Sequence, residues 1–266
     1  MRLTACVRQY PLSTYFALAF GISWGGILIV LGATDFNLVE IRPLDTGLIF
    51  VSMLLGPSVA GLTMTAMVDG RQGLHQLGLQ AARYRVGLRW YLVALMTMPL
   101  LLLATLLPLS VFVDPAFAPQ FQWRLFAIGL VAGSFEEVGW TGFAAPRLLA
   151  RHRLFMSGLF LGLVWALWHV LVDFRQNFNT LGTAWLLEFA VFYAAALTAY
   201  RLLMTWVYAN THSLLLAVLM HASYTGWLLV LYPKASPEQG AVWQTAFAAA
   251  SWVVVATVTV ACMRRR

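Results

Sequence analysis

Long apolar runs separated by short polar segments make up most of the chain. A membrane crossing needs about 20 apolar residues, and runs of this length occur along the whole chain. The runs are Leu12–Leu31, Gly47–Val68, Trp90–Val113, Leu125–Pro146, Leu154–Asp173, Thr183–Leu203, Ser213–Tyr232 and Ala241–Met263. We therefore predict an all-α, polytopic integral membrane protein with about eight transmembrane helices, in which residues 1–266 form a single domain.

The composition supports a membrane protein and argues against a nucleic-acid partner. Of the 266 residues, 61% are hydrophobic and only 10% are charged, whereas soluble domains average about 25% charged residues. The net charge of +7 does not indicate nucleic acid, because the basic residues lie between the hydrophobic runs and not on one polar segment. The predicted surroundings are membrane lipids. Cys6 and Cys262 lie at opposite ends of the chain, which predicts no disulfide framework.

The basic residues are divided unequally between alternate loops. One set of loops carries 13 of the 17 basic residues: Arg2, Arg8, Arg71, Arg83, Arg85, Arg89, Arg147, Arg151, Arg153, Arg201, Arg264, Arg265 and Arg266. The other set carries Arg42, Arg124, Arg175 and Lys234. The positive-inside rule then places both termini in the cytoplasm and the protein in the inner or plasma membrane as a multi-pass protein. The polar stretch 69–89 is predicted to be a cytoplasmic loop on anionic headgroups.

Two adjacent carboxylates, Glu136 and Glu137, lie in the middle of the fourth apolar run. An ionised side chain at bilayer depth costs roughly 2.5–3.5 kcal/mol, so such residues usually mark function. His169 and His221 lie in later apolar runs and are candidates to join them. The four residues indicate a reaction centre inside the membrane. The alternative is a structural polar cluster that ties the helices together.

Helix geometry separates the roles of these residues. Neighbouring residues on a helix point about 100° apart, so Glu136 and Glu137 cannot both face one point. One is expected to face the centre while the other orients a partner. His221 lies near the midpoint of its run, and Thr225 follows one turn later on the same face. The candidate catalytic residues are therefore Glu136, Glu137, His169, His221 and Thr225.

Three motifs carry a resemblance to a known family. They are Glu136–Gly142 with its adjacent glutamates, Trp165–His169, and Ser213–Ser223 with its histidine at position 221. In this order they resemble the CPBP family of intramembrane proteases, which comprises the CAAX prenyl endopeptidases and bacteriocin-processing proteins and is also called the Abi family. The motif helices are about 125–146, 154–173 and 213–232. The resemblance implies a fold of eight or so helices and hydrolysis of a peptide bond in a membrane-associated or lipidated substrate.

The sequence departs from the family pattern at three positions. Thr141 stands where the family usually has arginine, which leaves the carboxylates without a charge partner. Trp165 replaces a common phenylalanine, which we expect to be a mild aromatic exchange. Thr225 replaces an asparagine or aspartate, so that a hydroxyl takes the place of an amide donor. The first and third changes predict an altered or weakened enzyme.

The resemblance implies two versions of the mechanism. In the first, Glu136 activates a water as general base, His169 holds that water, and His221 with Thr225 stabilises the oxyanion, while Glu137 organises the helix. In the second, Glu136, His169 and His221 bind Zn²⁺. The sequence contains no His-Glu-x-x-His motif, so it establishes no cofactor and leaves zinc as the alternative.

Two other classes of function remain open. A proton-coupled transporter also carries buried glutamates and histidines, although the sequence shows no inverted repeat of the kind common in transporters. A catalytically weak or dead homologue would bind substrates or partners without cleaving them, as the two threonines at positions 141 and 225 allow. The sequence names neither the substrate nor the oligomeric state.

Overall fold

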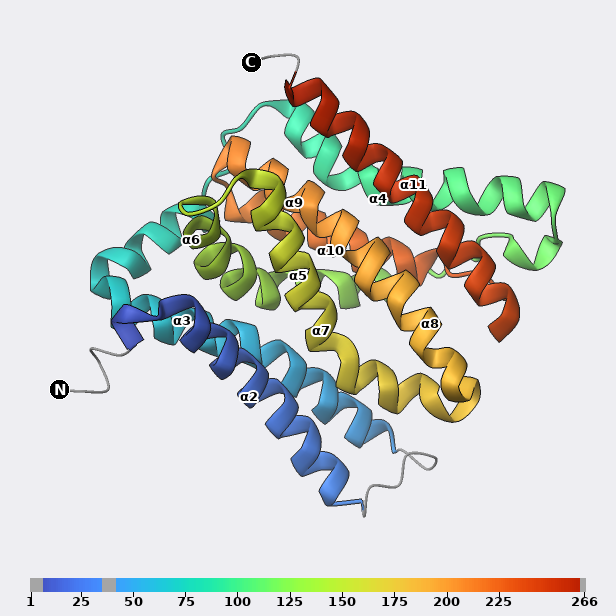
Figure 1. Ribbon diagram of the computed structural model, residues 1–266, viewed down its shortest axis with the longest axis horizontal. Helices are drawn as coiled ribbons and strands as arrows, with labels where there is room; N and C mark the ends of the chain where they lie inside the picture. Colours follow the sequence, from blue (N-terminus) through green and yellow to red (C-terminus); the bar gives the residue numbers. More distant parts are fainter. Residues whose placement is uncertain (1–6, 35–41, 264–266) are drawn as a thin grey trace.

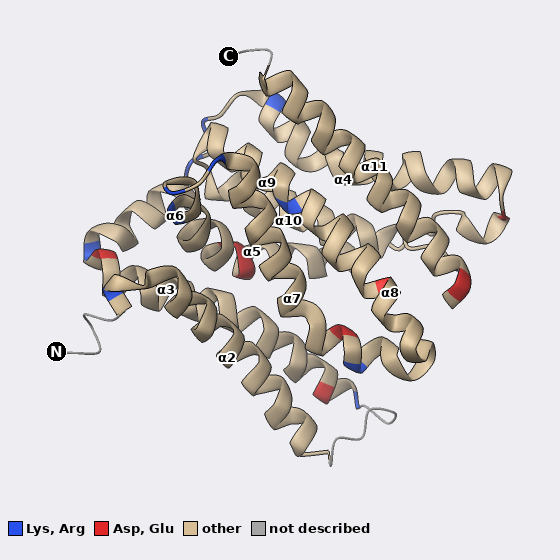
Figure 2. Cartoon of the chain, in the orientation of Figure 1, with Lys and Arg blue, Asp and Glu red and all other residues tan. Residues whose placement is uncertain are grey.

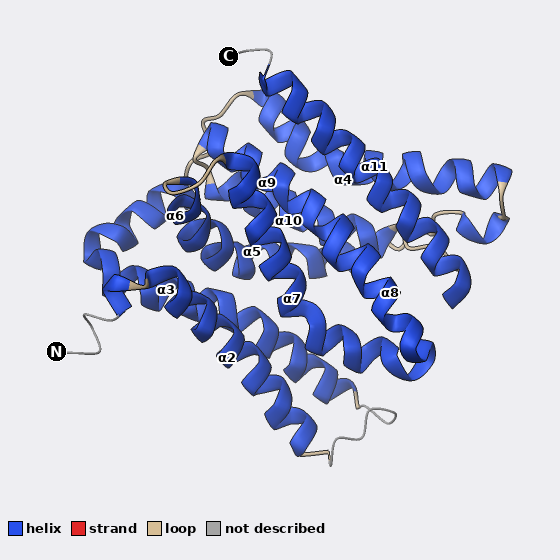
Figure 3. Ribbon diagram, viewed as in Figure 1, coloured by secondary structure: helices blue, strands red, loops and turns tan. Residues whose placement is uncertain are grey.

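The computed structural model describes residues 7–34 and 42–263, and this part of the chain is helical without strands (Figure 3). Cys6, Arg2 and the basic residues 264–266 lie outside the described residues. The helices are α2 (Pro11–Gly32), α3 (Pro43–Ala81), α4 (Leu88–Phe112), α5 (Phe126–Gly139), α6 (Ala145–Leu149), α7 (Leu154–Leu181), α8 (Trp185–Phe189), α9 (Thr198–Thr211), α10 (Leu214–Val230) and α11 (Pro237–Met263). Two π-helical segments join α5 to α6 (Trp140–Ala144) and α8 to α9 (Ala190–Leu197).

The prediction of an all-α polytopic membrane protein is confirmed. Five helical segments of the described chain are long and apolar enough to cross a membrane: Pro11–Gly32, Pro43–Ala81, Leu88–Phe112, Leu154–Thr211 and Pro237–Met263. The fourth of these is a helical hairpin, because the chain turns back at Gly182, whose φ is 56° (Figure 1). Eight crossings and cytoplasmic termini stay predictions.

Helix α5, which carries the paired glutamates, lies between α3 and α10 (Figure 1). Glycines allow this close approach. A Cβ atom on Gly133 would lie 2.7 Å from the carbonyl oxygen of Val218 in α10. A Cβ atom on Gly61 of α3 would lie 2.7 Å from the Cα of Gly139. Because contacts this short exclude any side chain, the backbone of α5 is clamped on both sides and the glutamates are held at a fixed depth.

The structure corrects the prediction for the polar stretch 69–89. Helix α3 continues past a break at Gly70, where φ is 66° and ψ is −155°, and ends only at Ala81. The first half of the stretch is therefore helical and not a loop. Glycine makes the break inexpensive, since it adopts positive φ without a steric penalty.

The structure also corrects the placement of Arg201, which the charge count put in a cytoplasmic loop. Arg201 is fully buried in α9, because this helix continues to Thr211, well beyond the predicted end of its apolar run. The remaining lysines and arginines still gather mainly at the end of the bundle that holds α6, while most acidic residues lie toward the opposite end (Figure 2). The charge asymmetry along the bundle thus does not depend on Arg201.

Candidate active site

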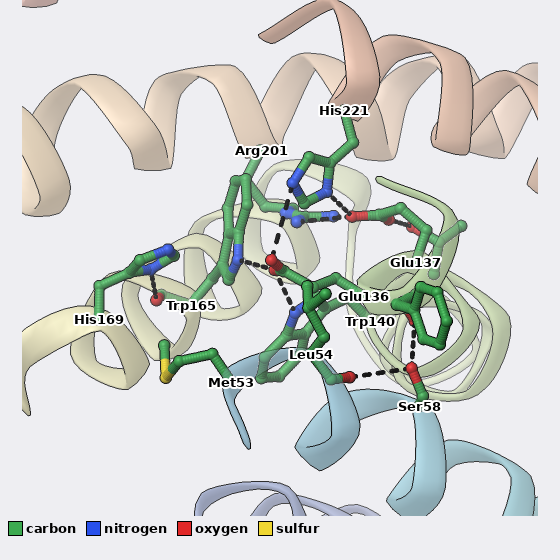
Figure 4. Close-up of polar contacts among 12 residues, drawn as sticks. Met53, Leu54, Ser58, Glu136, Glu137, Trp140, Trp165, His169, Arg201 and His221 are labelled. Atoms are coloured by element: carbon green, nitrogen blue, oxygen red, sulfur yellow. Dashed lines mark hydrogen bonds and ion pairs between the residues drawn. The ribbon is translucent and has the colours of Figure 1, made fainter. Parts of the chain in front are cut away.

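Glu136 and Glu137 lie at the end of α5, directly before the π-helical segment Trp140–Ala144. Both are buried, with 5% of Glu136 and 0% of Glu137 exposed. Single π-helical turns inside α-helices are found frequently at functional sites. The two side chains leave the helix in different directions, yet both carboxylates reach His221 and otherwise bind different partners (Figure 4).

Glu137 accepts hydrogen bonds at all of its acceptor positions. Arg201 donates to it twice, from Nη1 to Oε2 and from Nη2 to Oε1, each at 2.9 Å. His221 Nδ1 lies 2.7 Å from Oε1, and the hydroxyl of Thr141 donates to Oε2. A carboxylate offers about four lone-pair positions, and these four donors occupy them. Glu137 is thus built to hold other groups in place and has no free position for a reacting proton.

Glu136 is held on one oxygen and free on the other. Its Oε2 accepts from Trp165 Nε1 at 2.9 Å and from Trp140 Nε1 at 3.3 Å. Its Oε1 accepts no hydrogen bond from any described residue and lies 4.0 Å from His221 Nε2. This separation is too long for a direct hydrogen bond, so Oε1 keeps an unused acceptor position. Of the two carboxylates, Glu136 is therefore the one with an oxygen available for chemistry.

Trp165 connects the groups of the site (Figure 4). Its indole N–H binds Glu136, the guanidinium of Arg201 lies 3.8 Å from its ring centroid, and the ring of His221 lies at 5.1 Å. The expectation of a mild aromatic exchange at this position is therefore wrong. A phenylalanine has no N–H to donate, so Glu136 would lose the shorter of its two hydrogen bonds.

His169 is joined to the other residues through Trp165. Its Nδ1 lies 2.8 Å from the carbonyl oxygen of Trp165, and its ring packs against Trp168 and Tyr193 at 4.9 and 5.0 Å. Since a carbonyl oxygen only accepts, Nδ1 carries a proton, and Nε2 bears the lone pair of a neutral ring. Figure 4 shows Trp165 between His169 and Glu136. The structure therefore brings Glu136, Glu137 and His221 together, and His169 makes no hydrogen bond with these three.

Thr225 is half-buried one turn after His221 on α10. Its hydroxyl makes no hydrogen bond within the described part of the chain. A role for Thr225 beside His221 stays a prediction, supported by position and not by a contact.

Arg201 is the site residue that the sequence did not reveal. The missing arginine at position 141 predicted that the carboxylates have no charge partner, and for Glu137 this is wrong. Thr141 and Arg201 both bind Glu137, so a guanidinium from α9 supplies the charge that α5 lacks. One signal for a buried Arg201 was available, because the mainly apolar segment 202–207 follows it. Arg201 also lies close to the predicted end of the sixth run, however, and this favoured a position at the membrane interface.

The described residues do not fit the proposed zinc set. Among them, no group of three histidine, cysteine, aspartate or glutamate side chains is arranged to hold a metal ion. The hydrogen bonds of His169 and His221 use their Nδ1 atoms and leave each Nε2 free, so the obstacle is the distance between the residues. A zinc site would need His169 beside Glu136 and His221, and Trp165 stands between them (Figure 4).

Comparisons with known proteins point to the same part of the chain. Residues 118–227 match the family described as Type II CAAX prenyl endopeptidase Rce1-like. A segment of 113 residues is 30% identical to CAAX prenyl protease 2 of Methanococcus maripaludis, over 40% of this chain and 40% of that protein. The matched family region contains every residue of the site described above. Residues 118–227 are thus similar to the CAAX prenyl endopeptidases that the motifs also resemble, and the match covers less than half of the chain.

Proposed function

We propose that the protein is an intramembrane endopeptidase that hydrolyses a peptide bond of a membrane-associated or lipidated substrate. The observation that supports this most directly is the buried pair of Glu136 Oε1 and His221 Nε2, 4.0 Å apart, inside an Rce1-like domain. A related protein is named a CAAX prenyl protease, which makes a prenylated peptide the first substrate to test. The protein would act in the cytoplasmic membrane, with both termini inside the cell.

In this proposal Glu136 is the general base. A water between Glu136 Oε1 and His221 Nε2 gives a proton to the carboxylate as its oxygen attacks the carbonyl carbon of the peptide bond. The same carboxyl group then passes that proton to the leaving amine. The two indole N–H groups on Oε2 keep Oε1 directed at the reacting water throughout. They fix its position without occupying the reactive oxygen.

His221 stabilises the oxyanion. Its Nδ1 is fixed by Glu137, so its Nε2 side is the one presented to the substrate. In this role, Nε2–H donates to the oxygen that becomes negative in the transition state. Thr225 adds a hydroxyl donor, and His169 supports Trp165 through its hydrogen bond to the carbonyl oxygen of that residue.

The reason for expecting a dead enzyme is now weaker. The sequence predicted a weakened enzyme because Thr141, and not an arginine, lies one turn after Glu137. Arg201 binds that carboxylate through two hydrogen bonds, so the charge is present on another helix. At position 225, no other residue of the described chain supplies the amide donor that the threonine lacks.

We expect purified protein in vesicles to cleave a prenylated fluorescent peptide at a single bond. The same peptide without its prenyl group is the matched control, and it should be cleaved far more slowly because only the anchored peptide is concentrated at the membrane. Fluorescence dequenching gives the rate, and mass spectrometry gives the bond. Equal cleavage of the two peptides, or cleavage of neither, would contradict the proposal; proton uptake coupled to solute transport would support the transporter instead.

A further inference from the structure

A cavity of about 500 Å³ lies between the second half of α3 and the segment that follows the glutamates. Gln72, Gln76 and Gln80 line one side, and Gly142 and Arg147 are among the residues of the other. Its volume falls within the range of about 300–1,000 Å³ that is usual for ligand sites. Polar and apolar atoms contribute equally to its lining, and the polar share includes the three glutamines. The proposed reaction does not use this cavity.

We propose that this cavity binds an extended, uncharged polar stretch of the substrate peptide through its main chain. The inference rests on the proposed function, and it adds a binding site for the part of the substrate that is outside the lipid. Three observations support it: the amides that line the cavity, the spacing of these amides, and the neutral charge at its edge.

The amides have the hydrogen-bonding capacity of a peptide group. Each glutamine presents an N–H donor and a carbonyl acceptor, as does each residue of a main chain. Gln72 and Gln76 make no hydrogen bond with other described residues. Gln80 accepts from Tyr208 at 3.1 Å through Oε1, which leaves its amino group as a donor toward the cavity. All three side chains thus have unused hydrogen-bonding capacity for a ligand.

The spacing of the glutamines fits an extended chain. They follow one another at four-residue intervals on one face of the helix, about 6 Å apart along its axis at 1.5 Å per residue. In an extended strand, peptide groups that face the same side repeat about every 6.7 Å, which is twice the rise per residue. Because the two repeats are nearly equal, successive glutamines can bind successive peptide groups on the same side of an extended peptide, which belong to every second residue. A helical peptide, which turns its main-chain groups inward, gains nothing from them.

The charge at the cavity is neutral, which disfavours a phosphate or an anionic headgroup. Arg147 pairs with Asp69, donates to the carbonyl oxygen of Phe143 at 3.0 Å, and lies 3.7 Å from the centroid of that ring. Its guanidinium is therefore committed to the protein. A phosphate site would instead offer a cation with free donors.

The cavity adjoins the backbone that carries the site. A Cβ atom on Gly142 would lie 2.6 Å from Leu77 and 3.6 Å from the carbonyl oxygen of Glu137. The neighbouring residue, Thr141, donates to the Glu137 carboxylate. The lining of the cavity therefore includes a residue that lies five positions after Glu137, on the segment that follows the glutamates. Binding there positions the scissile bond and does not touch the reacting atoms.

The test compares KM and kcat for the prenylated peptide. Gln72→Leu with Gln76→Leu is expected to raise KM about tenfold, because the hydrogen bonds of both amides to the peptide are lost, while kcat changes little. Gln176→Leu, which replaces an exposed glutamine on α7, is the matched control and should leave both constants within about twofold. The alanine pair Gln72→Ala with Gln76→Ala should repeat the effect, which excludes an artefact of the added apolar side chains.

A second peptide tests whether the main chain is recognised. Methylating alternate backbone nitrogens of the polar stretch should raise KM for the wild type and add nothing further in the glutamine variant. An unchanged KM in both glutamine variants overturns the inference, as does a KM that follows the anionic lipid content of the vesicles. If the wild type cleaves no peptide, anisotropy of the fluorescent peptide separates the two proposals. Binding lost in the glutamine variants would then keep the cavity assignment and reject only the peptidase.

Discussion

Replacing Glu136 by glutamine is expected to lower kcat for peptide cleavage by about 10²–10⁴-fold, the usual contribution of a general base. Glutamine keeps the shape of the side chain, and its amide oxygen can still accept from the indoles of Trp140 and Trp165. It cannot take a proton from water. KM should therefore change little, because the lost interaction belongs to the transition state.

The matched control for this experiment is Glu238→Gln, which neutralises an exposed carboxylate at the start of α11. Its kcat should stay close to that of the wild type. Thermal unfolding of both variants in detergent shows whether the fold is kept. A folded Glu136→Gln protein that retains half of the wild-type rate would show that this carboxylate is not the base.

Replacing Arg201 by methionine is expected to destabilise the protein by roughly 3–5 kcal/mol, because it leaves the buried Glu137 carboxylate without its partner. Both side chains of this ion pair are fully buried. Arg201→Met should also misplace His221, which depends on the same carboxylate, so cleavage should fall with stability. The midpoint of thermal unfolding measures the first effect and the peptide reporter measures the second.

The double variant Arg201→Met with Glu137→Gln separates charge from packing. Removing the orphaned carboxylate should restore a large part of the lost stability while cleavage stays low, since the neutral amide holds His221 less firmly. Arg153→Met, at an exposed arginine before α7, is the control and should unfold like the wild type. A single variant as stable as the wild type, or a double variant no more stable than the single, would contradict this account of the ion pair.

The hydrophobic pattern predicted the helices well because lipid demands long apolar segments wherever the chain crosses it. Each predicted run falls on helical structure, although the fourth and sixth runs each cover two α-helices joined by a π-helical segment. Glu136, Glu137 and His221 were recognisable for the same reason, since a polar residue in such a run carries a high cost. His169 was recognisable in the same way. The direction of its side chain was not predictable, because the hydrophobic pattern along a helix does not show which side chain stands between two residues.

Arg201 and Trp165 show where sequence information ended. The pattern placed the end of the sixth run at Leu203, yet α9 continues to Thr211 and buries the arginine. The role of Trp165 depends on one indole N–H, whose target is set by how α5 and α7 pack and not by hydrophobicity. The π-helical turn after Gly139 also leaves no mark in a pattern with the period of an α-helix. Contacts between helices decided each of these features.

The most direct test of the central claim is cleavage of the prenylated peptide in water enriched in heavy oxygen, followed by mass spectrometry of the products. The account predicts one new carboxyl terminus that carries a single heavy oxygen atom with wild-type protein, and almost none with a folded Glu136→Gln variant. Products formed equally by the two proteins, or a new terminus without the label, would contradict hydrolysis by a water that Glu136 activates.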